Sequence, residues 1–130
     1  MSTFGVLPTS GSGLRVFRTW MDAISDNVAN LNTVKPTNEA AFQERFVVAQ
    51  AQQGGGSQVA GVLFGDPQGR VIYQPEHPLA DAEGMVRYPA VDLGDQMTQL
   101  LVAQRGYQAN LAVVERARDA YQAALTIGSR

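Results

Sequence analysis

The sequence contains no cysteine and only one histidine, His77, among its 130 residues. Without cysteine the chain cannot form a disulfide, bind a metal through thiolates or use a cysteine nucleophile. A single imidazole also removes most zinc sites and Ser-His-Asp triads. These absences argue against an enzyme and against a bound metal or other cofactor.

Positive charge is also sparse and scattered. Lys+Arg number 10 against 12 Asp+Glu, which gives a net charge of -2, and Lys35 is the single lysine. Phosphate neutralisation needs clustered cations, so we expect no nucleic-acid partner. No apolar run reaches the roughly 20 residues that span a bilayer, and residues 1–13 lack the features of a cleavable signal. We therefore expect no membrane span and no cleavable signal.

A first helix is predicted over residues 14–33. Its apolar residues recur every three or four positions, which is typical of a narrow coiled-coil seam. Ser12 is a suitable N-cap, and Pro36 disfavours helix just before it, so the helix should end near Thr33. Residues 1–13 contain Pro8, three glycines and several Ser and Thr residues. That composition predicts a disordered head.

A small β-rich middle domain is predicted over residues 34–92, which lose the helical period and hold five of the six prolines. Residues 42–49 and 59–64 have the composition of strands, with a glycine-rich loop between them. Asp-Pro-Gln-Gly then follows the second strand and favours a type I turn. We predict that residues 59–64 pair across this turn with residues 70–73.

A second, longer helix is predicted over residues 93–127, with Asp92 as N-cap and Gly128 as stop. About 35 residues at ~1.5 Å each give a length of roughly 50 Å. Two apolar stripes run along it, about 140° apart at ~100° per residue. The first consists of Leu93, Met97, Leu100, Tyr107, Leu111, Val114, Tyr121 and Leu125, and the second of Val102, Gly106, Ala109, Val113, Ala117, Ala120, Ala124 and Ile127.

These elements predict a mainly α chain with a small β part. The two helical segments (14–33 and 93–128) should pair as an antiparallel coiled-coil hairpin, with the middle domain inserted between them. The shorter first helix can cover one stripe, so the second is covered either by the middle domain folding back or by neighbouring copies. We favour neighbouring copies, since the middle is short and attached at one end. A heterologous contact of that kind builds a tube or filament.

Two kinds of polar residue leave alternatives open. His77 lies between Glu76 and Pro78, close to Asp81 and Glu83, which allows a metal or acid-base site. A rigid turn is the favoured use, because a residue before proline is held extended and no second histidine completes a ligand set. The asparagines Asn27, Asn30, Asn32 and Asn110 lie in the predicted helices, where asparagine is a poor helix former. In one interpretation the first three lie at the frayed end of the first helix and Asn110 lies on a solvated face. In the other, their side-chain amides form hydrogen bonds between helices and fix the helix register.

Three stretches resemble the bacterial flagellar axial proteins, the family of rod and hook components. Residues 21–33 (MDAISDNVANLNT) are similar to the N-terminal rod signature, and residues 103–110 (AQRGYQAN) with the ending ALTIG are similar to its C-terminal helix. Residues 71–89 narrow the resemblance to the proximal-rod subunits called rod protein C. The shared core there is Tyr-x-Pro-x-His-Pro-x-Ala-Asp-x-x-Gly, supplied by Tyr73, Pro75, His77, Pro78, Ala80, Asp81 and Gly84.

The resemblance implies a self-assembling structural subunit of the flagellar basal-body rod, the torque-transmitting drive shaft in the periplasm. It implies partners among copies of itself and other rod proteins, and export by the flagellar type III apparatus without signal cleavage. No small-molecule substrate is expected. Two alternatives are another axial component, such as a distal-rod or hook-junction protein, and a non-enzymatic helical binding or export adaptor.

The residues predicted to pack between subunits follow from the helical pattern and the resemblance. They are Leu14, Phe17, Met21, Ile24, Asn27, Val28, Asn30 and Thr33 on the first helix, and Met97, Leu100, Tyr107, Ala109, Asn110, Leu111, Val114, Ala120, Tyr121, Leu125 and Ile127 on the last.

Overall fold

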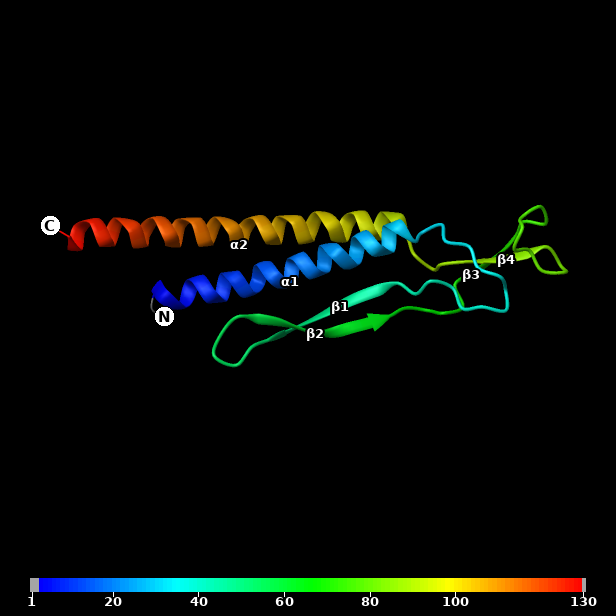
Figure 1. The fold of residues 1–130 in the computed structure, drawn as a ribbon, viewed down its shortest axis with the longest axis horizontal. Coiled ribbons are helices and arrows are strands. Elements are labelled where there is room, and N and C mark those ends of the chain that lie inside the picture. Colours follow the sequence, from blue (N-terminus) through cyan, green and yellow to red (C-terminus); the bar gives the residue numbers. More distant parts are fainter. Residues whose placement is uncertain (1–2, 130) are drawn as a thin grey trace.

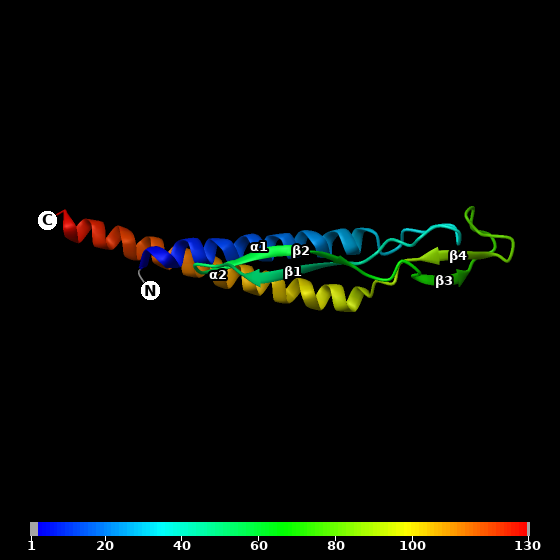
Figure 2. The same cartoon turned by 90° about the horizontal axis from the view of Figure 1, so that it is seen from below.

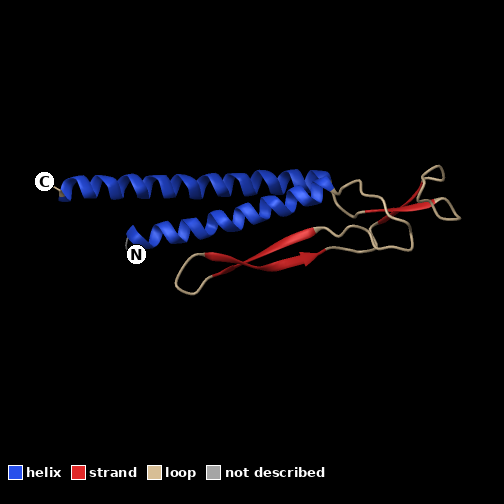
Figure 3. Cartoon of the chain, viewed as in Figure 1, coloured by secondary structure: helices blue, strands red, loops and turns tan. Residues whose placement is uncertain are grey.

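The computed structural model describes residues 3–129 and shows a long, narrow molecule (Figure 1). Along the chain, one helix precedes the four strands and one helix follows them. The elements are α1 (Thr3–Ala29), β1 (Arg45–Ala51), β2 (Ser57–Phe64), β3 (Arg70–Tyr73), β4 (Met85–Tyr88) and α2 (Leu93–Gly128). The expected mainly α chain with a small β part is confirmed (Figure 3).

Helix α2 agrees with the sequence prediction in extent and in its cap. It contains 36 residues and begins after Asp92, whose side chain accepts a hydrogen bond from the backbone N–H of Asp95 at 2.8 Å. This bond satisfies one of the free amides of the first turn, and no proline interrupts the helix. At ~1.5 Å per residue α2 is about 54 Å long, and its C-terminal end projects past the start of α1 (Figure 1).

Helix α1 begins well before the predicted start. It includes Pro8, and Ser12 lies inside it rather than capping it, so the prediction of a disordered head over residues 1–13 is wrong from Thr3 onward; residues 1 and 2 lie outside the described residues. The Ser12 hydroxyl donates to the carbonyl of Thr9 at 2.6 Å and accepts from the N–H of Ser57 at 3.0 Å. Contacts with the rest of the chain hold a segment whose composition alone favours disorder.

The strands form two separate antiparallel pairs, β1 with β2 and β3 with β4. The predicted strands at 42–49 and 59–64 are confirmed with small shifts, but the predicted pairing of 59–64 with 70–73 is wrong. The turn itself is present: Asp66 Oδ1 accepts from the N–H of Gln68 at 2.8 Å, and Gly69 has φ 59°. It turns the chain away from β2 because β1 and β4 already supply partners for the two strands.

The β1–β2 pair folds back along α1, so that α2, α1 and this hairpin form three layers (Figures 1 and 2). Both strands contact α1. The β3–β4 pair lies at the far end, beyond the junction of the helices (Figure 1). Residues 34–92 are therefore not carried as one unit at that end, and the fold-back covers the outer side of α1 rather than a stripe of α2.

Candidate subunit interface

The two helices meet along a seam of small and polar side chains. Gln96 and Ala103 are fully buried at 0% exposure, and the half-buried Asn110 follows at the same seven-residue interval. Phe17 rests against Gly106, where an added Cβ would lie 2.3 Å from the ring Cζ. Such an interval keeps one line of residues facing the partner helix, and small residues let the two backbones approach closely. The helix pair is antiparallel and close-packed.

Helix α1 covers the strip between the two apolar stripes of α2 and leaves the outer part of both exposed. On one side Leu93, Met97 and Leu111 are 47%, 40% and 38% exposed, and on the other Val102 and Val113 are 53% and 41% exposed. The expectation that α1 covers one of the two stripes is therefore wrong. We call these five residues the flanking rows of α2. They lie on two sides of the helix, so they give two separate surfaces.

The predicted subunit-packing residues divide according to helix. Those on α1 and at its end are used within the chain: Ile24 and Asn27 are buried, and Leu14, Phe17, Met21, Val28, Asn30 and Thr33 are half-buried. On α2 the half-buried ones are Leu100, Tyr107, Asn110 and Val114, and the exposed ones are Met97, Ala109, Leu111, Ala120, Tyr121, Leu125 and Ile127. Contact between subunits remains a prediction for all of them, with the exposed α2 group the accessible part.

A buried polar cluster joins both helices to the start of β1. Asn27 Nδ2 donates to Gln96 Oε1 at 3.0 Å, and Gln96 Nε2 donates to Glu44 Oε1 at 2.6 Å. Asn27 also bonds the backbone of Arg45 twice, donating to its carbonyl at 3.1 Å and accepting from its N–H at 2.9 Å. The sequence left open whether an asparagine forms a side-chain hydrogen bond between the two helices. Asn27 forms such a bond. Gln96 was missed by the sequence analysis; the signal that identifies it is the seven-residue interval from Gln96 to Ala103, repeated from Ala103 to Asn110.

Asn30 and Asn110 bond to their own helix or its end. Asn30 Nδ2 donates to the carbonyl of Asp26 at 2.9 Å, and Asn30 Oδ1 accepts from the Thr33 hydroxyl at 3.2 Å. Asn110 Nδ2 donates to the carbonyl of Gly106 at 3.0 Å, while Asn32 is exposed. The Nδ2 groups of Asn30 and Asn110 therefore satisfy carbonyl groups of their own helices, unlike that of Asn27, which reaches the other helix.

The middle-region motif builds the connection between β3 and β4. Asp81 Oδ1 accepts from the N–H groups of Glu83 and Met85 at 3.0 and 2.8 Å, and Asp81 Oδ2 accepts from the Thr37 hydroxyl at 2.7 Å. The bond from Met85 and then that from Thr37 lower the pKa of Asp81, with a smaller contribution from Glu83. Each of these bonds favours the ionised carboxylate. Asp81 therefore holds the loop in its folded shape.

The remaining motif residues shape the same loop. Gly84 has φ +77°, and an added Cβ would lie 2.8 Å from the Tyr73 ring and 3.0 Å from Pro75 Cβ. His77 Nδ1 accepts from the N–H of Leu79 at 3.1 Å, just after Pro78. Glycine is required where the chain adopts this left-handed conformation against an aromatic ring. The geometry is that of a turn, the use of His77 that the sequence favoured.

Replacing Asp81 with asparagine should weaken this loop, because charge-assisted hydrogen bonds are stronger than neutral ones. A lowered pKa means that the stabilisation is complete above the ordinary aspartate value and is lost as the pH falls through the lowered value. In the unchanged chain the Met85 and Glu83 amide NMR shifts should titrate together below about pH 4. They should not titrate in Asp81→Asn. A shared titration above that pH in the unchanged chain would contradict this account.

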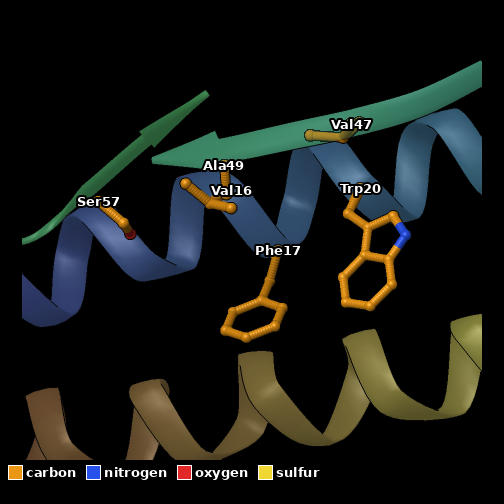
Figure 4. A pocket seen from close by; sticks show the side chains of 6 residues that line it. All are labelled: Val16, Phe17, Trp20, Val47, Ala49 and Ser57. Atoms are coloured by element: carbon orange, nitrogen blue, oxygen red, sulfur yellow. The ribbon is translucent and has the colours of Figure 1, made fainter. Parts of the chain in front are cut away.

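An apolar pocket of about 310 Å³ lies between α1 and the β1–β2 hairpin (Figure 4). Its lining includes Val16 on α1 and Val47 and Ala49 on β1, while Phe17 and Trp20 extend from α1 toward α2. The Phe17 and Trp20 rings are stacked, with centroids 6.2 Å apart. The pocket shows that the hairpin covers α1 loosely compared with the seam on its other side.

No helix in the described residues is long and apolar enough to cross a membrane. Within residues 3–129, no group of three or more His, Asp or Glu side chains is placed to hold a metal ion.

Two family descriptions match the two ends of the chain. "Flagella basal body rod protein" matches residues 7–37, and "Flagellar basal body rod FlgEFG protein C-terminal" matches residues 82–127. These segments contain most of α1 and α2, and with the packed helix pair they define a structural protein of the flagellar rod. Curated relatives narrow the assignment.

Flagellar basal-body rod protein FlgC of Yersinia enterocolitica is 32% identical over 98% of this chain and 99% of its own length. FlgC of Salmonella typhimurium is 30% identical and FlgC of Bacillus subtilis 28% identical, each over the same shares. The chain belongs to the flagellar basal-body rod protein FlgC family. It is a structural rod subunit of the bacterial flagellar basal body, which confirms the resemblance found in the sequence.

Proposed function

We propose that this rod subunit assembles with copies of itself and with other rod proteins through the exposed side of α2, and that the assembly transmits torque. The observation that carries the proposal is the pair of flanking rows, which stay exposed on both sides of the seam. Rows of exposed apolar side chains along one helix favour a protein partner. Two such surfaces on one helix allow each subunit to contact two neighbours, as an open assembly requires.

The mechanism is mechanical, and we infer no catalysis, cofactor, small-molecule substrate or nucleic-acid partner. Torque passes through a subunit only if its layers do not slide past one another. The Phe17–Gly106 contact and the buried Asn27–Gln96 bond join the helices, and the Asn27–Arg45 bonds join them to the hairpin. Close-packed interiors have low compressibility, which supports a stiff subunit.

We also propose that the chain reaches the periplasmic rod through the flagellar type III export apparatus without signal cleavage. The absence of cysteine supports this route, because a chain that enters an oxidising compartment then forms no disulfide on the way. If the chain were instead an export adaptor, it would stay in the cytoplasm. The presence or absence of the chain in purified basal bodies therefore distinguishes the two functions.

Ala109→Glu or Ala120→Glu should prevent incorporation into basal bodies and abolish motility. Both alanines are exposed on α2, so a glutamate costs the isolated chain about 0.5 kcal/mol or less, while at a contact it buries a charge. The measurement is mass spectrometry of purified basal bodies, which also reports whether the chain retains its N-terminal residues. Ala82→Glu, the same change on the exposed β3–β4 connection, serves as control and should assemble normally. Normal rods in both α2 variants would contradict the proposal.

A further inference from the structure

The β3–β4 pair and the loop between its strands, residues 70–88, lie beyond the junction of the helices (Figure 1). We call this part the distal lobe. Within the described residues neither β3 nor β4 contacts α1, α2, β1 or β2. The lobe is joined to the rest of the chain by three connectors, residues 30–44, 65–69 and 89–92. Its orientation relative to the helix pair is therefore determined where these connectors meet.

The connectors pack closely at their meeting point, which we call the waist. Ala41 of the first connector and Val91 of the third are 5% and 6% exposed. The N–H of Ala41 donates to the carbonyl of Pro67, in the second connector, at 2.9 Å. An added Cβ on Gly69 would overlap the carbonyl oxygen of Tyr88 and would lie 2.7 Å from the Cβ of Ala41. The waist thus has no room for a side chain at Gly69.

Arg87, on β4, reaches across the waist to two connectors. Its Nη2 donates to the carbonyl of Thr37 at 2.8 Å, and its Nη1 donates to the carbonyl of Gln68. The backbone N–H and C=O of Arg87 also pair with those of Lys35, each bond at 2.9 Å. The half-buried Arg87 side chain therefore joins the distal lobe to the first and second connectors at once.

The chemistry of the guanidinium group suits this position. Hydrogen bonds from a charged donor are stronger than neutral ones, and the planar fork of arginine fixes two acceptors relative to each other. The Nε of Arg87 is buried and has no hydrogen-bond partner within residues 3–129. A buried donor without a partner costs free energy. The chain keeps this costly placement, which indicates that the two Nη bonds outweigh it.

We propose that Arg87 is a positioning residue that fixes the orientation of the distal lobe relative to the helix pair. Without its two Nη bonds the connectors still join the lobe to the helices, but they flex at the waist while both parts stay folded. The inference is a statement about the single chain and does not depend on the proposed assembly. In a subunit that transmits torque, its consequence is that the lobe and the helices turn together.

The test uses the absence of cysteine. Ser25→Cys on α1 and Ala82→Cys on the distal lobe, both at exposed positions, carry nitroxide labels on the full chain. Electron paramagnetic resonance should give one narrow distance distribution, and Arg87→Ala should broaden it or add a second distance. Hydrogen exchange at the Ala41 amide should accelerate about tenfold or more in Arg87→Ala, because the waist opens locally. Exchange at the Arg45 amide, which bonds to Asn27, should stay the same.

Arg70→Ala is the matched control, since it removes the same charge at the waist. Arg70 Nε donates one long bond of 3.3 Å to the carbonyl of Pro89, so its loss should leave the label distance unchanged. Arg87→Lys keeps the charge but lacks the planar fork, and it should give an intermediate width. A label pair within the helix pair, Ser25→Cys with Gln108→Cys, should keep its distance in every variant.

An unchanged label distance and unchanged waist exchange in Arg87→Ala would show that packing alone holds the lobe, which overturns the proposal. Equal broadening in Arg70→Ala would overturn it too, because any lost charge at the waist would then have the same effect. If the β3–β4 amides lose their protection in Arg87→Ala, the lobe itself has unfolded and Arg87→Lys decides. With the lobe folded, a distribution in Arg87→Lys as narrow as that of the unchanged chain contradicts the proposal.

Discussion

Replacing Gln96 with leucine is expected to lower the free energy of unfolding by about 2 to 4 kcal/mol. Gln96 has no exposed surface, and its amide both accepts from Asn27 and donates to Glu44. Leucine has a similar volume but leaves the Asn27 amide and the Glu44 carboxylate short of one partner each. A buried polar group that loses its partner costs about 1 to 3 kcal/mol, and more if charged. Urea unfolding followed by circular dichroism gives the value.

Gln99→Leu is the matched control on the same helix. Gln99 is half-buried and accepts one long bond of 3.3 Å from Trp20 Nε1, so its loss should cost about 1 kcal/mol or less. The Gln96 variant should also raise hydrogen exchange at the Arg45 amide, which bonds to Asn27. An equal decrease in the free energy of unfolding in the two variants would mean that the buried cluster stabilises the chain no more than the Trp20–Gln99 bond does.

The second large effect concerns the contact of Gly106 with Phe17. Gly106→Leu should destabilise the chain by about 3 kcal/mol, because the Phe17 ring must leave the seam and loses its packing. An added Cβ at this position meets three ring atoms within 3 Å. Leucine has a higher helix propensity than glycine by almost 1 kcal/mol. The measured loss of stability is therefore the loss of packing minus this gain in helix propensity. Near-ultraviolet circular dichroism should report the change through Trp20, which stacks on Phe17.

Gly11→Leu provides the comparison, since Gly11 is also helical and an added Cβ there meets nothing within 4 Å. That variant should retain or gain stability. The double variant Phe17→Ala with Gly106→Leu exchanges a large residue for a small one across the seam, and it should recover part of the loss as a coupling between contacting sites. Additive losses in that double-mutant cycle would show that the two residues do not restrict each other.

Helix α2 could be predicted from sequence because its signals are local. Thirty-six residues without proline, a 3-4 apolar spacing and the Asp92 cap all specify the same element. The exposed residues Met97, Leu111 and Ile127 were also recognisable, since a stripe too long for its partner remains uncovered. The rod assignment followed from motif order, which periodicity alone does not supply.

The rest depended on contacts between distant residues. Residues 3–13 contain proline and three glycines, and they become helical because Ser12 bonds to Ser57 and Gly13 faces Asn110. The seam was misplaced because Gln96 and Asn110 are polar, so a search for apolar periodicity passes over the strip that is buried most. The strand pairing was predicted wrongly because a favourable turn sequence at Pro67 was taken as evidence that the two strands beside it pair with each other.

The buried cluster also determines when the molecule can fold. Asn27 and Gln96 are separated by 69 residues, and Trp20 and Gln99 by 79, so neither contact can form until most of the chain has been synthesised. Closing such long loops is paid in entropy before any packing is gained, which slows folding. During synthesis the β1–β2 hairpin is available to α1 early, since Asn27 and Arg45 are 18 residues apart, but the seam with α2 is not. The two helices can therefore pack against each other only after α2, the last element of the chain, has been made.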